Sequence, residues 1–115
     1  MNKRDAKILL KIQEEALAIA DFISGHDGDS FIKDEKTKRA VCMTLINIGE
    51  LVKHLSEDFR TANNHIPWKN IAGLRDIAVH GYQTLRMSDI WVNASEDVPE
   101  FLMRLGTIIR EAKTD

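Results

Sequence analysis

Residues 34–56 read DEKTKRAVCMTLINIGELVKHLS, and they predict the helix against which the rest of the chain packs. Asp34 is a residue type that caps the start of a helix. Apolar residues recur at intervals of four, three, four and three, which suits antiparallel packing in a helical bundle: Val41, Leu45, Ile48, Val52 and Leu55. Gly49 interrupts this helix. It indicates either the close approach of another helix, which could belong to a second subunit, or a glycine tolerated at a cost of ~1 kcal/mol relative to alanine.

The chain before this segment predicts one long helix and a turn. Residues 3–24 carry apolar side chains at helical spacing along one side: Ile8, Ile12, Ile19 and Ile23, with Leu9, Ala16 and Ala20 beside them. Residues 25–29 are rich in Gly and Asp, as turns are. Ser30 or Asp29 is then expected to cap a short helical turn in which Phe31 and Ile32 act as a hydrophobic plug.

Further helices are expected after residue 66. Pro67 suits the first position of a helix, because its missing N–H would have no partner there in any case. Ser88 or Asp89 can cap the next helix, and Pro99 should start or kink the last one. That last helix has a continuous apolar face: Val98, Phe101, Leu102, Leu105, Ile108, Ile109 and Ala112. We therefore predict an all-α fold, an antiparallel four-helix-type bundle with an additional short helix, in one domain over residues 1–115.

The composition is that of an ordinary globular protein, with 43% hydrophobic and 30% charged residues. The net charge of −2 argues against a general nucleic-acid binder. The charge is uneven, however, because residues 36–86 carry eight Lys and Arg against four Asp and Glu. That excess suits a modest positive site, although a solvated helix face would explain it equally well.

The sequence gives no sign of a membrane span or of an oxidising compartment. No apolar run approaches the roughly 20 residues that span a bilayer, and no signal-peptide pattern opens the chain. Cys42 is the one cysteine, so no intrachain disulfide can form. We expect a cytoplasmic protein without a membrane partner, in which Cys42 is a buried structural thiol.

Residues 73–82, GLRDIAVHGY, hold the side chains best suited to chemistry. On a helix Asp76 and His80 share a face, so the carboxylate can orient or charge the imidazole. Arg75 lies about 140° around the helix from His80 and reaches the same spot only through its long side chain. Gly81 is expected to end the helix in a left-handed conformation. Tyr82 would then project from the turn at the mouth of the site, and a buried core tyrosine is the other interpretation.

Arg75, His80 and Tyr82 have the spacing of the Arg-x4-His-x-Tyr signature of the HEPN superfamily, and the chain resembles its HepT-like toxin branch. The resemblance covers nearly the whole chain, through Ile48-Gly49-Glu50, Ile66-Pro67-Trp68, a Trp-containing helix after the motif and a last helix opened by proline. Asp76 departs from the Asn that many relatives carry after the Arg. It places a negative charge near any RNA phosphate.

The resemblance implies a toxin endoribonuclease that forms a homodimer with the motif at its interface. It also implies a partner, a cognate minimal nucleotidyltransferase antitoxin that attaches AMP to the motif tyrosine, here Tyr82. The resemblance also suggests that Glu50 lies near the motif, although an ordinary exposed Glu is the preferred interpretation.

Cleavage of an RNA substrate by its own 2′-hydroxyl needs neither a metal nor a cofactor, and we expect none. The four histidines are scattered, without the spacing of zinc ligands. His80 can act as general acid or base, Arg75 can hold the phosphate oxygens, and Asp76 can orient His80. One histidine cannot conveniently make both proton transfers at once, so a homodimer with two motifs is expected. The alternative function is a non-catalytic helical adaptor that docks a nucleotidyltransferase through the motif surface.

Overall fold

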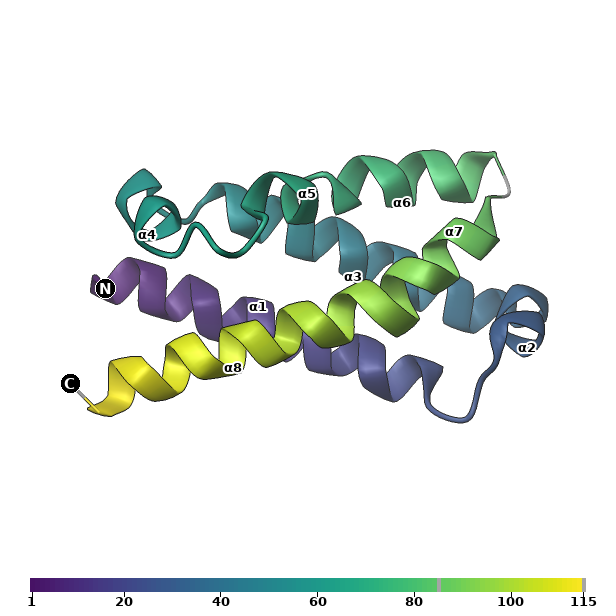
Figure 1. The fold of residues 1–115 in the computed structure, drawn as a ribbon. Coiled ribbons are helices and arrows are strands. Elements are labelled where there is room, and N and C mark those ends of the chain that lie inside the picture. Colours follow the sequence, from purple (N-terminus) through teal and green to yellow (C-terminus); the bar gives the residue numbers. More distant parts are fainter. Residues whose placement is uncertain (85, 115) are drawn as a thin grey trace.

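The structure of the chain, a computed structural model, describes residues 1–84 and 86–114. Its helices are α1 (Lys3–Ile23), α2 (Gly28–Lys33), α3 (Glu35–Lys53), α4 (Glu57–Ala62), α5 (Trp68–Ala72), α6 (Leu74–Gln83), α7 (Met87–Val92), the π-helical turn η1 (Asn93–Asp97) and α8 (Val98–Thr114). Figure 1 shows α1, α3, the α5–α6 pair and the α7–α8 pair along the length of the molecule, each antiparallel to the one before it. The described residues contain no strand, and the predicted all-α bundle is confirmed.

The helix α3 lies at the centre of the packing, against α1, α5 and α6. The apolar residues predicted to face the bundle are buried. Those within α3 have 0% exposed surface, and Leu55 just beyond the helix has 2%. Asp34 caps this helix as predicted, because its carboxylate accepts the Thr37 N–H at 3.1 Å. The helix ends at Lys53 rather than at residue 56, because Ser56 instead caps α4.

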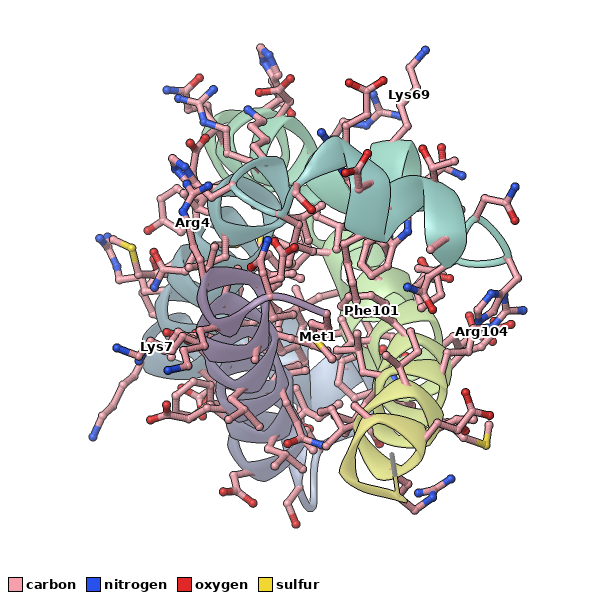
Figure 2. All side chains as sticks on the ribbon, turned by 90° about the vertical axis from the view of Figure 1, so that its left-hand side faces the viewer. Met1, Arg4, Lys7, Lys69, Phe101 and Arg104 are labelled. Carbon is pink, nitrogen blue, oxygen red and sulfur yellow. The ribbon has the colours of Figure 1, made fainter. Side chains whose placement is uncertain are left out.

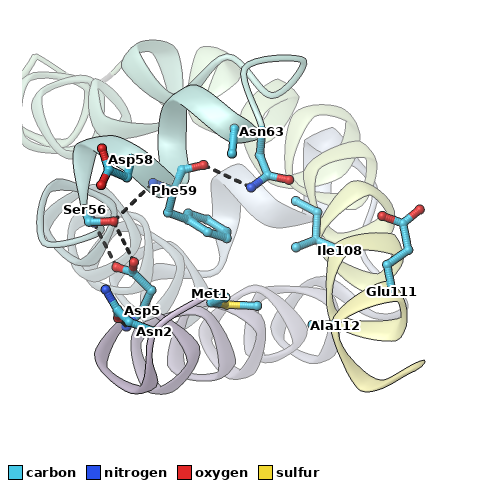
Figure 3. Close-up of a pocket in the computed structure, with 11 residues that line it drawn as sticks. Met1, Asn2, Asp5, Ser56, Asp58, Phe59, Asn63, Ile108, Glu111 and Ala112 are labelled. Atoms are coloured by element: carbon cyan, nitrogen blue, oxygen red, sulfur yellow. Dashed lines mark hydrogen bonds between the residues drawn. The ribbon is translucent and has the colours of Figure 1, made fainter. Parts of the chain in front are cut away.

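One buried carboxylate ties the start of α1 to the link between α3 and α4. Asp5, which is 2% exposed, accepts the Ser56 N–H at 2.8 Å and the Ser56 hydroxyl at 2.6 Å. The same hydroxyl oxygen accepts the Phe59 N–H at 3.1 Å. Burial works to raise the pKa of Asp5, but the hydrogen bonds from Ser56 hold that pKa below its usual value. Figure 3 shows these bonds beside a cavity of about 500 Å³ at one end of the bundle.

The N-terminal elements agree with the sequence except at the cap of α2. The first helix ends one residue before its predicted end, and Gly25, with a φ of 82°, forms the expected turn. Asp27 caps α2 instead of Ser30 or Asp29. Its carboxylate accepts the Ser30 N–H at 2.8 Å, while the Ser30 hydroxyl oxygen accepts the Asp27 N–H at 3.0 Å. Ser30 thus completes a reciprocal capping box.

Aromatic rings fill the core toward both ends of the bundle. Phe31 is fully buried, and its ring lies 5.2 Å from that of Trp91, which joins α2 to α7. The predicted plug is therefore formed by Phe31 alone, since Ile32 is 43% exposed. Toward the other end, the Trp68 ring lies 5.7 Å from Phe59 and 6.1 Å from Phe101. In the end-on view of Figure 2, Phe101 points into the bundle while charged side chains extend outward. No described helix combines the length and the apolar content that a membrane crossing requires.

The start of α7 differs from the prediction because Gly81 does not end α6. Gly81 lies inside the helix, which continues for two more residues. A Cβ at this position would lie 3.0 Å from Ile90 Cδ1, so the missing side chain lets α7 pack closely against α6. The seventh helix begins at Met87 without the side-chain cap expected from Ser88 or Asp89.

Pro99 marks the start of the last helix, as predicted. The π-helical turn η1 lies directly before it, and there the Val98 N–H donates to Asn93 O, five residues back. Because the proline ring carries no N–H, it cannot continue the α-helical pattern of hydrogen bonds, and a π turn is one way to absorb that break. The predicted apolar face of α8 is buried or half-buried, except that Ala112 is exposed.

Candidate active site

The sixth helix crosses α3 at Gly49, and this crossing positions the motif. A Cβ at Gly49 would come within 2.8 Å of Arg75 N, Arg75 Cβ and Ala72 O. Backbone atoms cannot turn aside as the end of a flexible side chain can, so the contact requires glycine. The close approach predicted at Gly49 is therefore made within the chain. Neither a second subunit nor a merely tolerated glycine is needed to explain it.

The crossing brings Arg75 over Glu50, between two carboxylates. Arg75 Nε lies 3.1 Å from Glu50 Oε1, and Arg75 Nη1 lies 2.9 Å from Asp76 Oδ1. The same Glu50 oxygen lies 3.4 Å from Lys53 Nζ. The hydrogen bond from Arg75 holds the pKa of the Asp76 carboxyl below its usual value. Glu50 thus lies near the motif, as the resemblance suggested, and it is half-buried rather than an ordinary exposed Glu. Nη2 of Arg75 has no partner among the described residues, and the side chain is 45% exposed.

His80 lies on another side of α6, in an open groove between α6 and α7. The groove has a volume of about 480 Å³. It is lined by Asp76, Ile77, His80, Gly81, Arg86, Asp89, Val92 and Asn93. Such a volume is ordinary for a ligand pocket. The imidazole is exposed, so it is accessible to a substrate that enters the groove.

Asp76 and His80 share this groove, as their spacing predicts, but the carboxylate is engaged elsewhere. Asp76 accepts its hydrogen bond from Arg75, and in the described part of the chain no hydrogen bond joins it to His80. Arg75 itself does not line the groove. The role of Asp76 in orienting His80 therefore stays a prediction, and Asp76 instead links Arg75 to the rim of the His80 groove.

The sequence predicted that Tyr82 lies at the mouth of this site, but in the structure it does not. It is half-buried inside α6, and about 160° of helix rotation separates it from His80. Its hydroxyl donates to Glu35 Oε1 at 2.5 Å, and the Arg39 guanidinium lies 5.2 Å from the ring centroid. The hydrogen bond to Glu35 raises the pKa of Tyr82, and the same bond lowers the pKa of Glu35.

The tyrosine borders a second, more apolar groove of about 290 Å³ between α3 and α6. The lining residues are Arg39, Cys42, Met43, Ile46, Ala78, Val79, Tyr82 and Gln83. The partners of Tyr82 were not predicted, because Glu35 lies 47 residues away in sequence. Only the packing of α6 on α3 brings them together. Arg75 shares this side of α6, seven residues or about two turns earlier.

The structure also assembles a Ser-His-Asp set that the sequence analysis did not identify. His26 Nδ1 lies 3.0 Å from Ser30 Oγ, and His26 Nε2 lies 3.5 Å from Asp34 Oδ2. The spacing of four residues between His26 and Ser30 was the available signal. Ser30 is engaged in the capping box of α2 and Asp34 caps α3, so this cluster joins two helix starts.

Cys42 is buried, as predicted, with 5% of its surface exposed. Burial raises the pKa of its thiol to about 11, so the group stays protonated at neutral pH. In the described part of the chain, no group of three His, Cys, Asp or Glu side chains is placed to hold a metal ion.

The chain is similar to proteins named as ribonucleases. It is 38% identical over 112 residues, 96% of this chain and 93% of the relative, to "Putative RNase MJ0127" of Methanocaldococcus jannaschii. Identity is 32% over 102 residues, 89% of this chain and 91% of the relative, with "Putative RNase TTE0752" of Caldanaerobacter subterraneus subsp. tengcongensis. Identity is 34% over 98 residues, 84% of this chain and 89% of the relative, with "Probable ribonuclease HepT" of Thermococcus cleftensis. No solved structure matches the chain.

The family described as "Ribonuclease HepT-like" matches residues 12–108, which include α3, the motif and both grooves beside α6. The match covers well over half of the 115 residues, and the three relatives named above are covered over 89–93% of their length. The chain belongs to the ribonuclease HepT-like family.

Proposed function

We propose that this chain is an endoribonuclease that cuts RNA through His80 and Arg75 without a metal ion. The observation that carries the proposal is the exposed His80 ring in an open groove, one helical turn from Asp76. Asp76 in turn is bonded to Arg75, whose Nη2 has no partner among the described residues. Membership of the ribonuclease HepT-like family supports the same activity.

The proposed reaction uses the 2′-hydroxyl of RNA as its nucleophile. The 2′-oxygen forms a bond to phosphorus and the bond from phosphorus to the 5′-oxygen breaks. The products are a 2′,3′-cyclic phosphate end and a 5′-hydroxyl end. His80 takes the 2′-hydroxyl proton or gives a proton to the leaving 5′-oxygen. Arg75 holds the non-bridging oxygens as negative charge develops on them.

A shared site between two copies of the chain would supply both proton-transfer groups. One imidazole cannot give and take a proton in the same step, whereas two copies bring two His80 rings and two Arg75 guanidinium groups. The positions of Arg75 and His80 on different sides of α6 support this arrangement, because two facing copies can combine groups that one copy keeps apart. The proposed assembly is a homodimer.

The proposal extends to regulation by a nucleotidyltransferase partner, with the chain as the toxin of a toxin–antitoxin pair. The Tyr82 oxygen would attack the α-phosphorus of ATP, pyrophosphate would leave, and the hydroxyl proton would pass to the Glu35 carboxylate that already accepts it. AMP on Tyr82 adds a negative charge and the bulk of adenine on the side of α6 that carries Arg75, where it opposes the approach of RNA.

The activity is tested with purified protein and RNA in EDTA, comparing wild type with His80→Ala and Arg75→Ala. Loss of a transition-state contact of this kind costs roughly 10²–10³ in rate. His54→Ala is the matched control, because His54 is also exposed but lies at the end of α3. EDTA-resistant cleavage that only the two motif variants lose supports the proposal. A protein that binds the nucleotidyltransferase but never cleaves RNA would instead be the helical adaptor.

The modification is tested by co-expression with the cognate nucleotidyltransferase. The mass of the chain should rise by one or more AMP units located on Tyr82 by peptide mass spectrometry, and Tyr82→Phe should keep cleavage yet escape neutralisation. Equal neutralisation of Tyr82→Phe, without an AMP adduct on the native chain, would assign the antitoxin another mode of action.

A further inference from the structure

The His80 groove contains an arginine that is not part of the motif. Among the described residues that line the groove, Arg86 is the one Lys or Arg. Its backbone N–H donates to Gly81 O at 2.8 Å, which fixes the start of the side chain beside the turn of α6 that carries His80. Arg75, the cation of the motif, lies outside this groove. The positive charge nearest to His80 within the groove is therefore supplied by a residue without an assigned role.

The guanidinium of Arg86 is held only weakly. Its Nε lies 3.3 Å from Asp89 Oδ2, and the two side chains are 72% and 58% exposed. Ion pairs this exposed contribute about 0–1 kcal/mol, because water and salt screen them. A phosphodiester that enters the groove can displace Asp89, since arginine binds two phosphate oxygens side by side in a fork that a single carboxylate oxygen at this distance does not fill.

The rest of the groove suits the non-ionic part of a nucleotide. Ile77 is 42% exposed and Val92 is 45% exposed, and they line the groove from α6 and α7. Exposed apolar side chains of this size can contact the face of a base or a ribose. The groove thus combines an accessible imidazole, a releasable arginine and an apolar wall.

We propose that Arg86 binds an RNA phosphate adjacent to the one that is cut and so fixes how the strand lies across His80. This inference rests on the proposed ribonuclease function and deepens it. Arg86 is a substrate-binding residue, separate from Arg75, which contacts the reacting phosphate. Asp89 competes with the phosphate for Arg86, so removing its charge should tighten binding rather than weaken it.

The test measures binding of a single-stranded RNA oligonucleotide to the full chain carrying His80→Ala, so that binding is read without cleavage. Adding Arg86→Ala should raise Kd about tenfold, as expected for loss of a charged hydrogen bond. It should also reduce the slope of log Kd against log salt by about 0.7, the value for one phosphate contact on a single strand. Adding Asp89→Asn should lower Kd. Arg110→Ala is the control, since Arg110 is exposed on α8 and bonds only to Thr107 among the described residues.

The outcomes separate this inference from the function on which it rests. Wild-type protein that does not cleave RNA refutes the ribonuclease function itself. If wild type cleaves RNA while Arg86→Ala matches Arg110→Ala in both Kd and salt slope, the Arg86 inference alone is wrong. Weaker binding by Asp89→Asn, or no RNA binding by the His80→Ala chain, also overturns it. In the His80-intact chain, Arg86→Ala should raise KM while leaving kcat close to that of wild type.

Discussion

Glu50 places Arg75 for its proposed contact with phosphate. Its Oε1 lies 3.1 Å from Nε, and this ion pair holds the guanidinium in place and leaves Nη2 for a substrate oxygen. The pair is too exposed to contribute much to folding, since surface ion pairs are worth about 0–1 kcal/mol. Its effect should therefore be seen in the reaction rather than in stability.

We predict that Glu50→Gln lowers kcat for RNA cleavage about ten- to a hundredfold, because a displaced catalytic group loses its alignment with the reacting atoms. KM and the melting temperature should change little. Glu57→Gln serves as the control, because Glu57 is an exposed Glu in the first turn of α4. A Glu50→Gln enzyme with wild-type kcat would show that Arg75 does not depend on this partner.

Asp5 gives the fold a pH dependence with a definite sign. Its pKa is lower in the folded chain than its ordinary value of 3.8, because the Ser56 hydrogen bonds outweigh the effect of burial. A lowered folded pKa means that the contribution to stability is complete above the unfolded pKa and is lost as pH falls through the folded pKa.

We predict that Asp5→Asn destabilises the protein by about 1.5–3 kcal/mol at pH 7, the range for hydrogen bonds to a charged group. Chemical denaturation at several pH values checks this. The difference from wild type should shrink below pH ~4, where the Asp5 carboxyl becomes protonated first in the unfolded chain and, at lower pH, in the folded chain. A difference that stays constant down to pH ~2 would contradict the role of the ionised carboxylate.

At the scale of elements, two glycines set how helices meet. Gly49 lets α6 lie on α3, and Gly81 lets α7 lie on α6. The two sites differ in what surrounds them. A Cβ at Gly49 would meet backbone atoms at 2.8 Å, whereas one at Gly81 would meet the Ile90 side chain at 3.0 Å.

We predict that Gly49→Ala destabilises the chain by about 1–3 kcal/mol, the usual cost of overpacking, even after a gain of up to ~1 kcal/mol in helix propensity. It should also reduce cleavage, because α6 carries Arg75. Gly106→Ala is the matched control in α8, where the added Cβ would meet only the end of Arg110 at 3.3 Å. Equal melting temperatures for the two variants would mean that the α3–α6 contact is not tight.

The features that could be predicted from the sequence are those set by residue spacing within a single helix. Residue types and their spacing alone predict the buried apolar row of α3, its Asp34 cap and the placement of Asp76 and His80 on one face. Contacts between distant segments were missed, since no local pattern encodes them. Asp5 with Ser56 is 51 residues apart, and Tyr82 with Glu35 is 47 apart.

The prediction that Gly81 ends α6 was wrong because glycine suits more than one structural position. Glycine is common both at helix ends and where helices pack closely, and the sequence does not distinguish the two. Because the end of α6 was predicted wrongly, the position of Tyr82 was also predicted wrongly. Tyr82 lies beside Glu35 and not at the mouth of the His80 groove. Arg86 was overlooked for a related reason, because only the packing of α7 on α6 brings it into the groove.

At the scale of the whole molecule, the proposed active site belongs to two copies. We predict that wild-type chain unfolded and refolded with an excess of His80→Ala chain loses more cleavage than dilution explains, because each mixed dimer keeps only one of the two His80 imidazoles. Light scattering should give the mass of a dimer at micromolar concentration. A fully active monomer, or a mixture that keeps the full activity of its wild-type share, would contradict the shared site.

The proposed role of His80 in promoting attack by the 2′-hydroxyl of RNA can be tested with one substitution in the substrate. After the cut position in an RNA is mapped, the same RNA is made with a single 2′-deoxynucleotide on the 5′ side of that bond and incubated with the protein in EDTA. We predict that cleavage at this position disappears, while neighbouring sites are still cut to 2′,3′-cyclic phosphate and 5′-hydroxyl ends by wild type and not by His80→Ala. Continued cleavage at the deoxy position, or ends that carry a 5′-phosphate, would contradict it.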